Sequence, residues 1–182
     1  MRYKRLPRTF FDRPTVTVAQ ELLGKTLVFQ NHRGRITETE AYIGQDDPAC
    51  HAARGLTPRT KPMFGPPGFS YIYFIYGMYF CLNIVTEEQG FPAAVLIRGL
   101  LHEDGTHYNG PGKLCRALGL TKEQNEIDMI TSKELYVLDT PAWTDFDATP
   151  RIGIKQGLDK YWRFVVRKEV LQPQKNSVKS LS

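Results

Sequence analysis

The stretch Phe69-Ser70-Tyr71-Ile72-Tyr73-Phe74-Ile75-Tyr76-Gly77-Met78-Tyr79-Phe80 has seven aromatic residues among its twelve. Aromatic and β-branched residues with one glycine at a turn predict a β-hairpin whose tip is Tyr76-Gly77-Met78. Because bases stack on tyrosine rings and apolar side chains can wedge between base steps, nucleic acid is the first partner that this stretch indicates. The alternative is a tyrosine-rich hairpin that only closes a core.

Composition and charge favour one domain with an anionic partner. The chain has 182 residues, 41% of them hydrophobic, which suits a single domain that buries roughly 70% of its unfolded surface. The formal net charge of +5 favours an anionic partner. Because no apolar run approaches the roughly 20 residues that span a bilayer, and residues 1–5 lead into no signal-peptide core, we expect no membrane contact. We therefore expect a cytoplasmic location.

The cysteines and histidines predict neither a metal site nor a disulfide framework. Cys50, Cys81 and Cys115 are odd in number and lack CxxC spacing, so reduced thiols are expected. The four histidines form no HExxH arrangement, and no cluster of acidic residues completes a site around them. We therefore expect no metal and no cofactor.

The N-terminal part predicts a short helix followed by two strands. Pro14 opens the helix, an apolar stripe at helical spacing follows, and Gly24 suits its C-cap. The strands are expected at residues 26–30 and 35–42, joined by a hairpin-like connection with Gly34 near its end. Residues 44–68 are rich in Gly, Pro, Asp and Arg, and such a segment in a compact domain is usually functional or disordered.

A second helix is expected after a buried strand at residues 93–99. Gly110-Pro111-Gly112-Lys113 opens this helix, which carries Leu114 and Leu118 on one face and ends near Gly119. Its free N–H groups could hold a phosphate, but an ordinary turn before a core helix explains the same residues.

The C-terminal part predicts three more strands, at residues 134–138, 151–154 and 162–166. The tail, residues 173–182, lacks aromatic residues and an apolar period, so we expect it to be disordered. Residues 1–172 are expected to form one domain.

A pair of carboxylates in the second strand is the first candidate for chemistry. Strand alternation places Glu38, Glu40 and Tyr42 on one face, with neighbours roughly 6.6 Å apart. If that face is enclosed, burial and the neighbouring carboxylate raise the proton affinity of one glutamate. That glutamate then has the character of a general base. The alternative is a solvent-facing strand whose glutamates pair with Arg or Lys.

Three further polar residues stand out. Arg98 follows a buried apolar run, so its charge must find an anion such as Glu40 or a phosphate. Asn83 enters apolar surroundings after the aromatic stretch, where a backbone hydrogen bond is its ordinary role. His51 lies in the irregular segment, where a structural histidine is the usual finding.

Several motifs, in the order in which they follow along the chain, resemble those of the alkyladenine (3-methyladenine) DNA glycosylase family. The resemblance covers roughly residues 6 to 167. They are Glu38-Thr39-Glu40-Ala41-Tyr42, Thr57-Pro58-Arg59, Met63-Phe64, the segment from Tyr71 to Asn83, Val95-Leu96-Ile97-Arg98, Gly110-Pro111-Gly112-Lys113-Leu114 and Pro150-Arg151-Ile152-Gly153-Ile154.

The resemblance implies a pocket for an extruded base and a carboxylate beside it. Glu40 falls where the family activates the attacking water, and Arg98 where a residue helps to hold that water. The positions whose side chains line the family's base pocket are Tyr42, His51, Tyr73 and Asn83. Asn83 matches the residue that clashes with the exocyclic amino group of normal guanine.

The resemblance also implies contacts with duplex DNA. Tyr76 and Met78 fall at the hairpin tip, which the family pushes into the minor groove to fill the gap left by the flipped nucleotide. Arg59, Lys113 and Arg151 are the expected contacts to the DNA backbone. The loop before His51 and its spacing to Thr57 differ from some relatives, which puts loop contacts in doubt and leaves the pocket intact.

The sequence thus predicts a monofunctional DNA glycosylase that excises alkylated or deaminated purines from double-stranded DNA by hydrolysis. The lesions would be of the 3-methyladenine, 7-methylguanine, hypoxanthine and ethenoadenine class, and no lyase activity is expected because no amine nucleophile is indicated. A non-catalytic damage-sensing module is the alternative, and Glu40 argues against it. An RNA-binding protein is disfavoured because no RNP-like or KH motif is visible.

The strand-rich pattern predicts a single mixed α+β domain. The resemblance adds a curved antiparallel sheet, surrounding short helices and a protruding β-hairpin. A monomer without an obligate protein partner is expected, because no heptad pattern appears.

Overall fold

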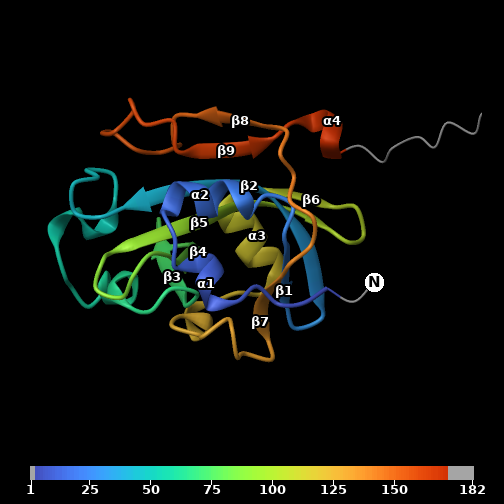
Figure 1. Ribbon diagram of the computed structural model, residues 1–182, viewed down its shortest axis with the longest axis horizontal. Coiled ribbons are helices and arrows are strands. Elements are labelled where there is room, and N and C mark those ends of the chain that lie inside the picture. Colours follow the sequence, from blue (N-terminus) through green and yellow to red (C-terminus); the bar gives the residue numbers. More distant parts are fainter. Residues whose placement is uncertain (1–2, 172–182) are drawn as a thin grey trace, which may run out of the picture.

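Nine antiparallel strands form one curled sheet in the computed structural model, which describes residues 3–171 (Figure 1). The strands are β1 Thr26–Phe29, β2 His32–Ile43, β3 Ser70–Ile75, β4 Tyr79–Val85, β5 Ala93–His102, β6 His107–Asn109, β7 Leu135–Leu138, β8 Phe146–Thr149 and β9 Arg163–Val166. Their main path is β3-β4-β5-β2-β1-β7, with β6 paired to β5 and the β8–β9 hairpin paired to β2 through β9.

Short helices surround this sheet. The α-helices are α1 Arg8–Phe11, α2 Thr15–Glu21, α3 Pro111–Leu118 and α4 Lys168–Leu171, and the 3-10 helices are η1 His51–Arg54, η2 Lys61–Phe64 and η3 Lys122–Gln124. The architecture confirms the predicted single mixed α+β domain with a curved antiparallel sheet.

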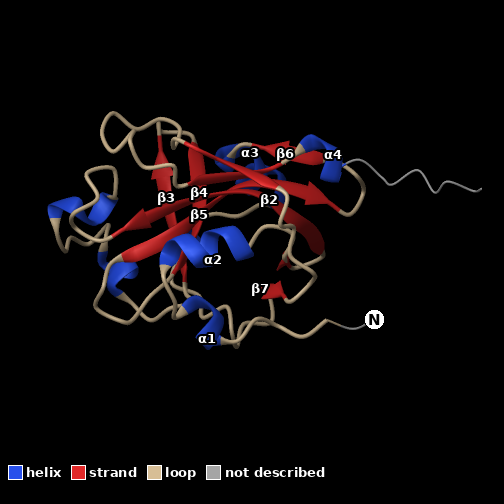
Figure 2. Ribbon diagram, turned by 45° about the horizontal axis from the view of Figure 1, so that its top comes forward, coloured by secondary structure: helices blue, strands red, loops and turns tan. Residues whose placement is uncertain are grey.

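Strand β2 separates the main core from the face that carries the carboxylates. Helix α2 lies across β2 and β5 (Figure 2) and contacts both of them. The hydroxyl of Thr39 donates a hydrogen bond to the carbonyl of Ala19 in α2, at 2.8 Å, and Ala41 lies in the same apolar cluster as Ala19. Since side chains alternate along a strand, Glu38, Glu40 and Tyr42 face the opposite side.

A second, smaller cluster lies on that opposite side. It contains buried residues of the irregular segment and of the aromatic hairpin: Cys50, Ala52, Met63, Tyr71, Val85 and Ala94. The irregular segment is ordered by η1 and η2 and packs against the sheet, so its side chains can be held in fixed positions.

The aromatic stretch forms the predicted hairpin. Ile75 of β3 pairs with Tyr79 of β4, which leaves Tyr76-Gly77-Met78 as the tip. The amide of Met78 donates to the carbonyl of Ile75 at 3.1 Å. Tyr76 and Gly77 have φ values of 53° and 66°, a left-handed conformation in which glycine at the second position carries no Cβ penalty.

The connection between β1 and β2 differs from the prediction. Phe29 pairs with His32, so the turn consists of Gln30 and Asn31, and Gly34 lies inside β2. A Cβ at Gly34 would stand 2.5 Å from Cγ of Leu100 on the neighbouring strand. Gly34 is therefore needed for close packing between strands and not for a turn.

The predicted strand at residues 151–154 is wrong. These residues form the loop that follows β8, and the edge of β2 that they could have joined is paired with β9 instead. The strands predicted at residues 93–99, 134–138 and 162–166 are confirmed as β5, β7 and β9, and the helix opened by Gly110 is confirmed as α3. The predicted disordered tail lies outside the described residues.

Candidate active site

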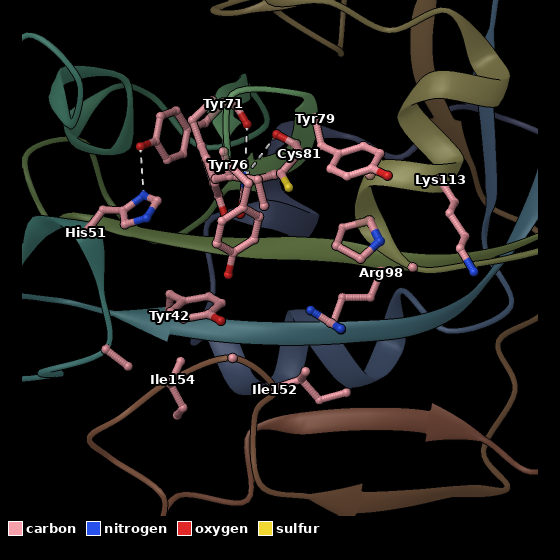
Figure 3. Close-up of a pocket in the computed structure, with 18 of the residues that line it drawn as sticks. Tyr42, His51, Tyr71, Tyr76, Tyr79, Cys81, Arg98, Lys113, Ile152 and Ile154 are labelled. Carbon is pink, nitrogen blue, oxygen red and sulfur yellow. Dashed lines mark hydrogen bonds between the residues drawn. The ribbon is translucent and has the colours of Figure 1, made fainter.

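A cavity of about 460 Å³ opens beside the aromatic hairpin. Figure 3 shows Tyr42 and Arg98 in its middle, His51 at one side and Lys113 of α3 at the far side. The cavity also receives Tyr71, Tyr73, Ile75, Tyr76, Tyr79, Cys81 and Asn83 from the hairpin, and Ile152, Gly153 and Ile154 from the loop after β8. Its size and mixed apolar and polar lining are typical of sites that enclose a small aromatic molecule.

Two irregularities in the sheet bring Arg98 to the carboxylates. Ile36 pairs with Leu100, Glu38 with Gly99 and Thr39 with Ile97, so Thr37 on β2 and Arg98 on β5 each lack a partner in this register. Such bulges redirect side chains beside active sites. Arg98 Nε lies 2.9 Å from Oε1 of Glu38 and 3.5 Å from Oε1 of Glu40.

Glu40 is fully buried beneath the cavity wall. Its Oε2 accepts a 2.7 Å hydrogen bond from the Tyr42 hydroxyl, and its Oε1 accepts one of 2.7 Å from the Ile152 amide. The three groups that contact this carboxylate, from Tyr42, Ile152 and Arg98, all belong to residues that line the cavity. Glu40 thus sits one layer behind the surface of the site, so the predicted solvent-facing alternative is excluded for it.

Burial changes the proton affinities of Glu40 and Tyr42. It raises the pKa of Glu40, an effect that the Arg98 charge, the Ile152 amide and the Tyr42 hydroxyl oppose and that Glu38 reinforces. Burial and the Glu40 charge raise the pKa of Tyr42, so its phenol stays protonated and serves as a hydrogen-bond donor. A carboxylate with a raised pKa is a stronger base, which suits proton abstraction near neutral pH.

His51, Tyr71 and Tyr73 form an aromatic wall. The rings of His51 and Tyr73 meet edge to face with centroids 4.4 Å apart, and Nδ1 of His51 lies 3.1 Å from the Tyr71 hydroxyl. Burial, with a smaller contribution from Arg59, lowers the pKa of His51 to about 4. The histidine is therefore a neutral ring at physiological pH.

The neutral state of His51 predicts a pH-dependent stability. An unfolded histidine has a pKa of about 6.5, so between pH 6.5 and 4 the unfolded chain binds a proton that the folded protein does not bind. Stability therefore falls as the pH falls through this window. We expect His51→Gln to lose less stability than wild type between pH 7 and pH 5 in urea unfolding. Equal losses for His51→Gln and wild type would contradict the neutral state of His51.

Tyr42 is supported from behind by a buried ion pair. The Arg151 guanidinium lies 4.7 Å from the Tyr42 ring centroid and binds Asp47 through two nitrogens, at 2.6 and 2.8 Å. Arg151 also donates to the carbonyl of Ala41 at 2.9 Å and is only 3% exposed. The prediction that Arg151 contacts the DNA backbone is therefore corrected, because its charge is buried and neutralised inside the protein.

Asn83 is one of the polar residues that line the cavity. Its Nδ2 donates to the carbonyls of Tyr71 and Cys81, at 3.1 and 3.4 Å, and the residue is buried. These two bonds fix the side chain in one orientation, so it presents a rigid polar surface to anything in the cavity.

The remaining predicted contact residues lie at the rim. The tip residues Tyr76 and Met78 are 81% and 64% exposed, which is unusual for large apolar side chains. Arg59 is exposed with its guanidinium 5.6 Å from the Tyr73 ring centroid, and Lys113 is exposed at the start of α3. Glu40 and Arg59 thus contact residues that line the cavity, and Met78 belongs to the hairpin tip beside it. The predicted site residues that line the cavity themselves are Tyr42, His51, Tyr73, Tyr76, Asn83, Arg98 and Lys113.

Sequence reasoning missed three polar contacts that hold the charged groups of this site. The Ile152 amide binds Glu40, and Asp47 holds Arg151. Arg163 of β9 donates to Glu38 at 2.6 Å. Only the Asp47 position carried a local signal, an Asp-Pro step in an irregular segment, because the other two depend on which strand pairs with the edge of β2.

Over residues 3–171 the structure shows no cluster of His, Cys, Asp and Glu that could hold a metal ion. In the same range no helix has the length and apolar character needed to cross a bilayer. Cys50, Cys81 and Cys115 are buried free thiols, and burial raises the pKa of Cys50 and Cys81 to about 11, so they are protonated at neutral pH.

Comparison with known proteins identifies the family. Residues 9–170 match the model of the methylpurine-DNA glycosylase family. A protein of Wolbachia from Brugia malayi is 60% identical over 163 residues, which cover 88% of this chain and 96% of that protein. One from Sodalis glossinidius is 61% identical over 161 residues, 87% and 95% of the two chains, and one from Ehrlichia chaffeensis is 56% identical over 166 residues, 88% and 92%. All three bear the name "Putative 3-methyladenine DNA glycosylase".

A cavity that combines aromatic walls, a buried carboxylate and an exposed aromatic tip agrees with these matches. The chain belongs to the methylpurine-DNA glycosylase family, whose members hydrolyse N-glycosyl bonds, and it is a DNA glycosylase that acts on lesions of the 3-methyladenine type.

Proposed function

We propose that this enzyme flips a damaged purine out of duplex DNA into the cavity and hydrolyses its N-glycosyl bond with a water activated by Glu40. The observation that carries the proposal is the contact of the buried Glu40 carboxylate with three residues that line the cavity, Tyr42, Arg98 and Ile152. The proposed lesions are 3-methyladenine, 7-methylguanine, hypoxanthine and ethenoadenine, and the product is an abasic site for base excision repair.

Extrusion of the base is the first step. A nucleotide that leaves the stack costs a few kcal/mol, less when the base is damaged or mispaired. The exposed ring of Tyr76, with Met78 beside it, would fill the vacancy. The flipped base would then lie between Tyr42 on one side and His51 and Tyr73 on the other, where a cationic purine also gains from the ring faces.

Hydrolysis then needs little beyond a positioned water and negative charge. The water oxygen bonds to the anomeric carbon, the bond from that carbon to the purine nitrogen breaks, and Glu40 takes a proton from the water. 3-Methyladenine and 7-methylguanine are cationic in DNA and leave as neutral bases, whereas hypoxanthine and ethenoadenine are neutral in DNA and leave as anions that take up a proton from solvent water. The Glu40 charge also stabilises the positive charge that develops on the sugar.

Selection against normal bases is assigned to Asn83. Its side chain is held by hydrogen bonds to two backbone carbonyls, so it would not turn away from the amino group of a guanine in the cavity. The substrates are then purines that lack this amino group, together with cationic purines whose charge gives them enough binding energy to enter despite it.

A panel of duplex oligonucleotides tests the proposed function. Each carries one hypoxanthine, ethenoadenine or 7-methylguanine, and base release is read as an alkali-labile site. We expect release from members of this panel with a strand that stays intact until alkali is added. A protein that binds these duplexes without releasing any base would be a damage sensor, and cleavage before alkali would contradict hydrolysis without lyase activity.

The hairpin tip has a prediction of its own. Tyr76→Ala should weaken capture of the flipped base by roughly 5- to 150-fold, since one aromatic stacking contact contributes about 1 to 3 kcal/mol. Ethenoadenine fluorescence in duplex DNA follows the flipped state directly. Tyr161→Ala is a matched control, because Tyr161 is 58% exposed and lies outside the cavity lining. Equal fluorescence changes for Tyr76→Ala and wild type would contradict the role of the tip.

We also propose that the enzyme acts as a monomer, without an obligate protein partner, in the bacterial cytoplasm where the DNA lies. Light scattering of the purified chain, with and without a lesion duplex, measures the oligomeric state. A stable dimer would contradict this part of the proposal.

A further inference from the structure

The second carboxylate of the site, Glu38, touches Arg98 but does not line the cavity. Its Oε1 accepts hydrogen bonds from Nε of Arg98 at 2.9 Å and from Nε of Arg163 at 2.6 Å. Glu38 is 4% exposed, so these contacts are shielded from water. Arg98 Nε is thus closer to Glu38 than to Glu40, from which it is separated by 3.5 Å.

The backbone keeps Arg98 closer to Glu38 than to Glu40. Arg98 has no partner in the β2–β5 register, and it is followed by Gly99, which pairs with Glu38. A Cβ at Gly99 would stand 2.4 Å from the Thr37 hydroxyl oxygen and 3.1 Å from Cβ of Glu38. The close approach that glycine permits here brings Glu38 and Arg98 together.

The position of Arg98 between the two carboxylates affects the proton affinity of Glu40. A guanidinium bound closely to a carboxylate lowers its proton affinity, whereas a nearby carboxylate raises it. Glu38 therefore acts twice: its own charge favours protonation of Glu40, and its hydrogen bond keeps Arg98 at a longer distance. The other groups that face Glu40 from β2, β3, β4, β9 and the loop after β8 are Tyr42, Tyr73, Cys81, Arg163, Arg151 and the Ile152 amide.

We propose that Glu38 is a positioning residue for hydrolysis: it holds Arg98 back from Glu40, so that Glu40 keeps the proton affinity of a general base. This inference rests on the proposed role of Glu40. Arg163 completes the arrangement by neutralising the second carboxylate, which allows both glutamates to remain close together in a buried position.

The acid limb of the pH–rate profile tests the inference. Single-turnover release of 7-methylguanine from a duplex oligonucleotide is measured with enzyme in excess, because this cationic base needs no protonation to leave. Rates then fall at low pH only as the general base becomes protonated. Glu38→Gln should move the midpoint of this limb down by about one pH unit and lower the plateau rate about three- to tenfold, because Arg98 shifts to Glu40.

Three further variants distinguish an effect of the position of Arg98 from an effect of lost charge and from a failure to fold. Glu38→Asp keeps the charge and should leave the midpoint close to wild type. Arg163→Gln removes a cation without freeing Arg98, so its midpoint should not move down. In the double variant Glu38→Gln/Arg163→Met one negative and one positive charge are lost together, which avoids an unpaired buried charge; its midpoint should still move down. This double variant keeps the test valid where Glu38→Gln alone does not fold.

The possible results are distinct. Lower midpoints for Glu38→Gln and the double variant, with Glu38→Asp unchanged, support the positioning role. A profile of the folded double variant that superimposes on wild type overturns it, while the proposed function stands as long as wild type releases the base. No release by wild type from any lesion duplex means that the proposed function itself has failed.

Discussion

Glu40→Gln is expected to lower the rate of base release by about 1000-fold or more while damaged duplexes still bind. A general base contributes typically about 100- to 10,000-fold, and in the proposed reaction the same carboxylate also stabilises the developing sugar cation. Glutamine has nearly the same shape. Its oxygen can accept the hydrogen bond from the Ile152 amide, and the Tyr42 hydroxyl can turn to accept one from the new NH₂ group.

Two measurements check this expectation. Single-turnover assays give the rate of base release, and fluorescence anisotropy of a labelled lesion duplex gives binding. Glu88→Gln is the matched control, since Glu88 is exposed and lies outside the cavity lining, and it should release bases at the wild-type rate. Normal turnover by Glu40→Gln would show that another group activates the water, and loss of binding together with turnover would point to a damaged cavity.

Asp47→Ala is expected to have the largest effect on folding, a loss of about 3 to 5 kcal/mol in the free energy of unfolding. The substitution leaves the Arg151 guanidinium buried without its anion. Asp47 also accepts hydrogen bonds from the amides of Ile43 and Ala49, so the loop that leads to His51 loses its anchor as well. Among the described residues, Nε of Arg151 is buried and already has no hydrogen-bond partner. No other acceptor is therefore at hand to replace the hydrogen bonds to Asp47.

Urea unfolding measures this loss as a lower midpoint at an unchanged slope. Asp46→Ala is the control, because Asp46 precedes Asp47 in the chain and is exposed, and its midpoint should stay within the experimental error of wild type. The loop from Arg151 to Ile154 supplies the amide that binds Glu40, so base release by the folded fraction of Asp47→Ala should fall too. Equal midpoints for both variants would mean that the ion pair adds nothing to stability.

The parts of the site that the sequence predicted depend on local rules. The tip Tyr76-Gly77-Met78 follows from a glycine in a turn between two aromatic strands, and the structure confirms it. Strand alternation alone placed Glu40 and Tyr42 on one face, and a 2.7 Å hydrogen bond now joins them. These features hold because the side-chain period of a strand and the dihedral preferences of a turn involve only neighbouring residues.

The parts that the sequence left open depend on residues far apart. The choice between a solvent-facing Glu40 and an enclosed one was decided by Arg98 and Ile152, which reach it from another strand and from a distant loop. The wrong strand at residues 151–154 and the wrong role of Arg151 have a common cause. Both follow from the pairing of β9 with β2, which leaves this loop to close the cavity and Arg151 to bind Asp47.

The order of the residues is enough to predict the fold class, the aromatic hairpin with its tip, and the strand face that carries Glu40. Only the folded chain shows that Glu40 is buried, that Arg98 is shared between two carboxylates and that Arg151 supports Tyr42 from inside the protein. The physical reason is that burial and ion pairing are sums over contacts between distant segments, and a local pattern of residues contains no information about which segments meet.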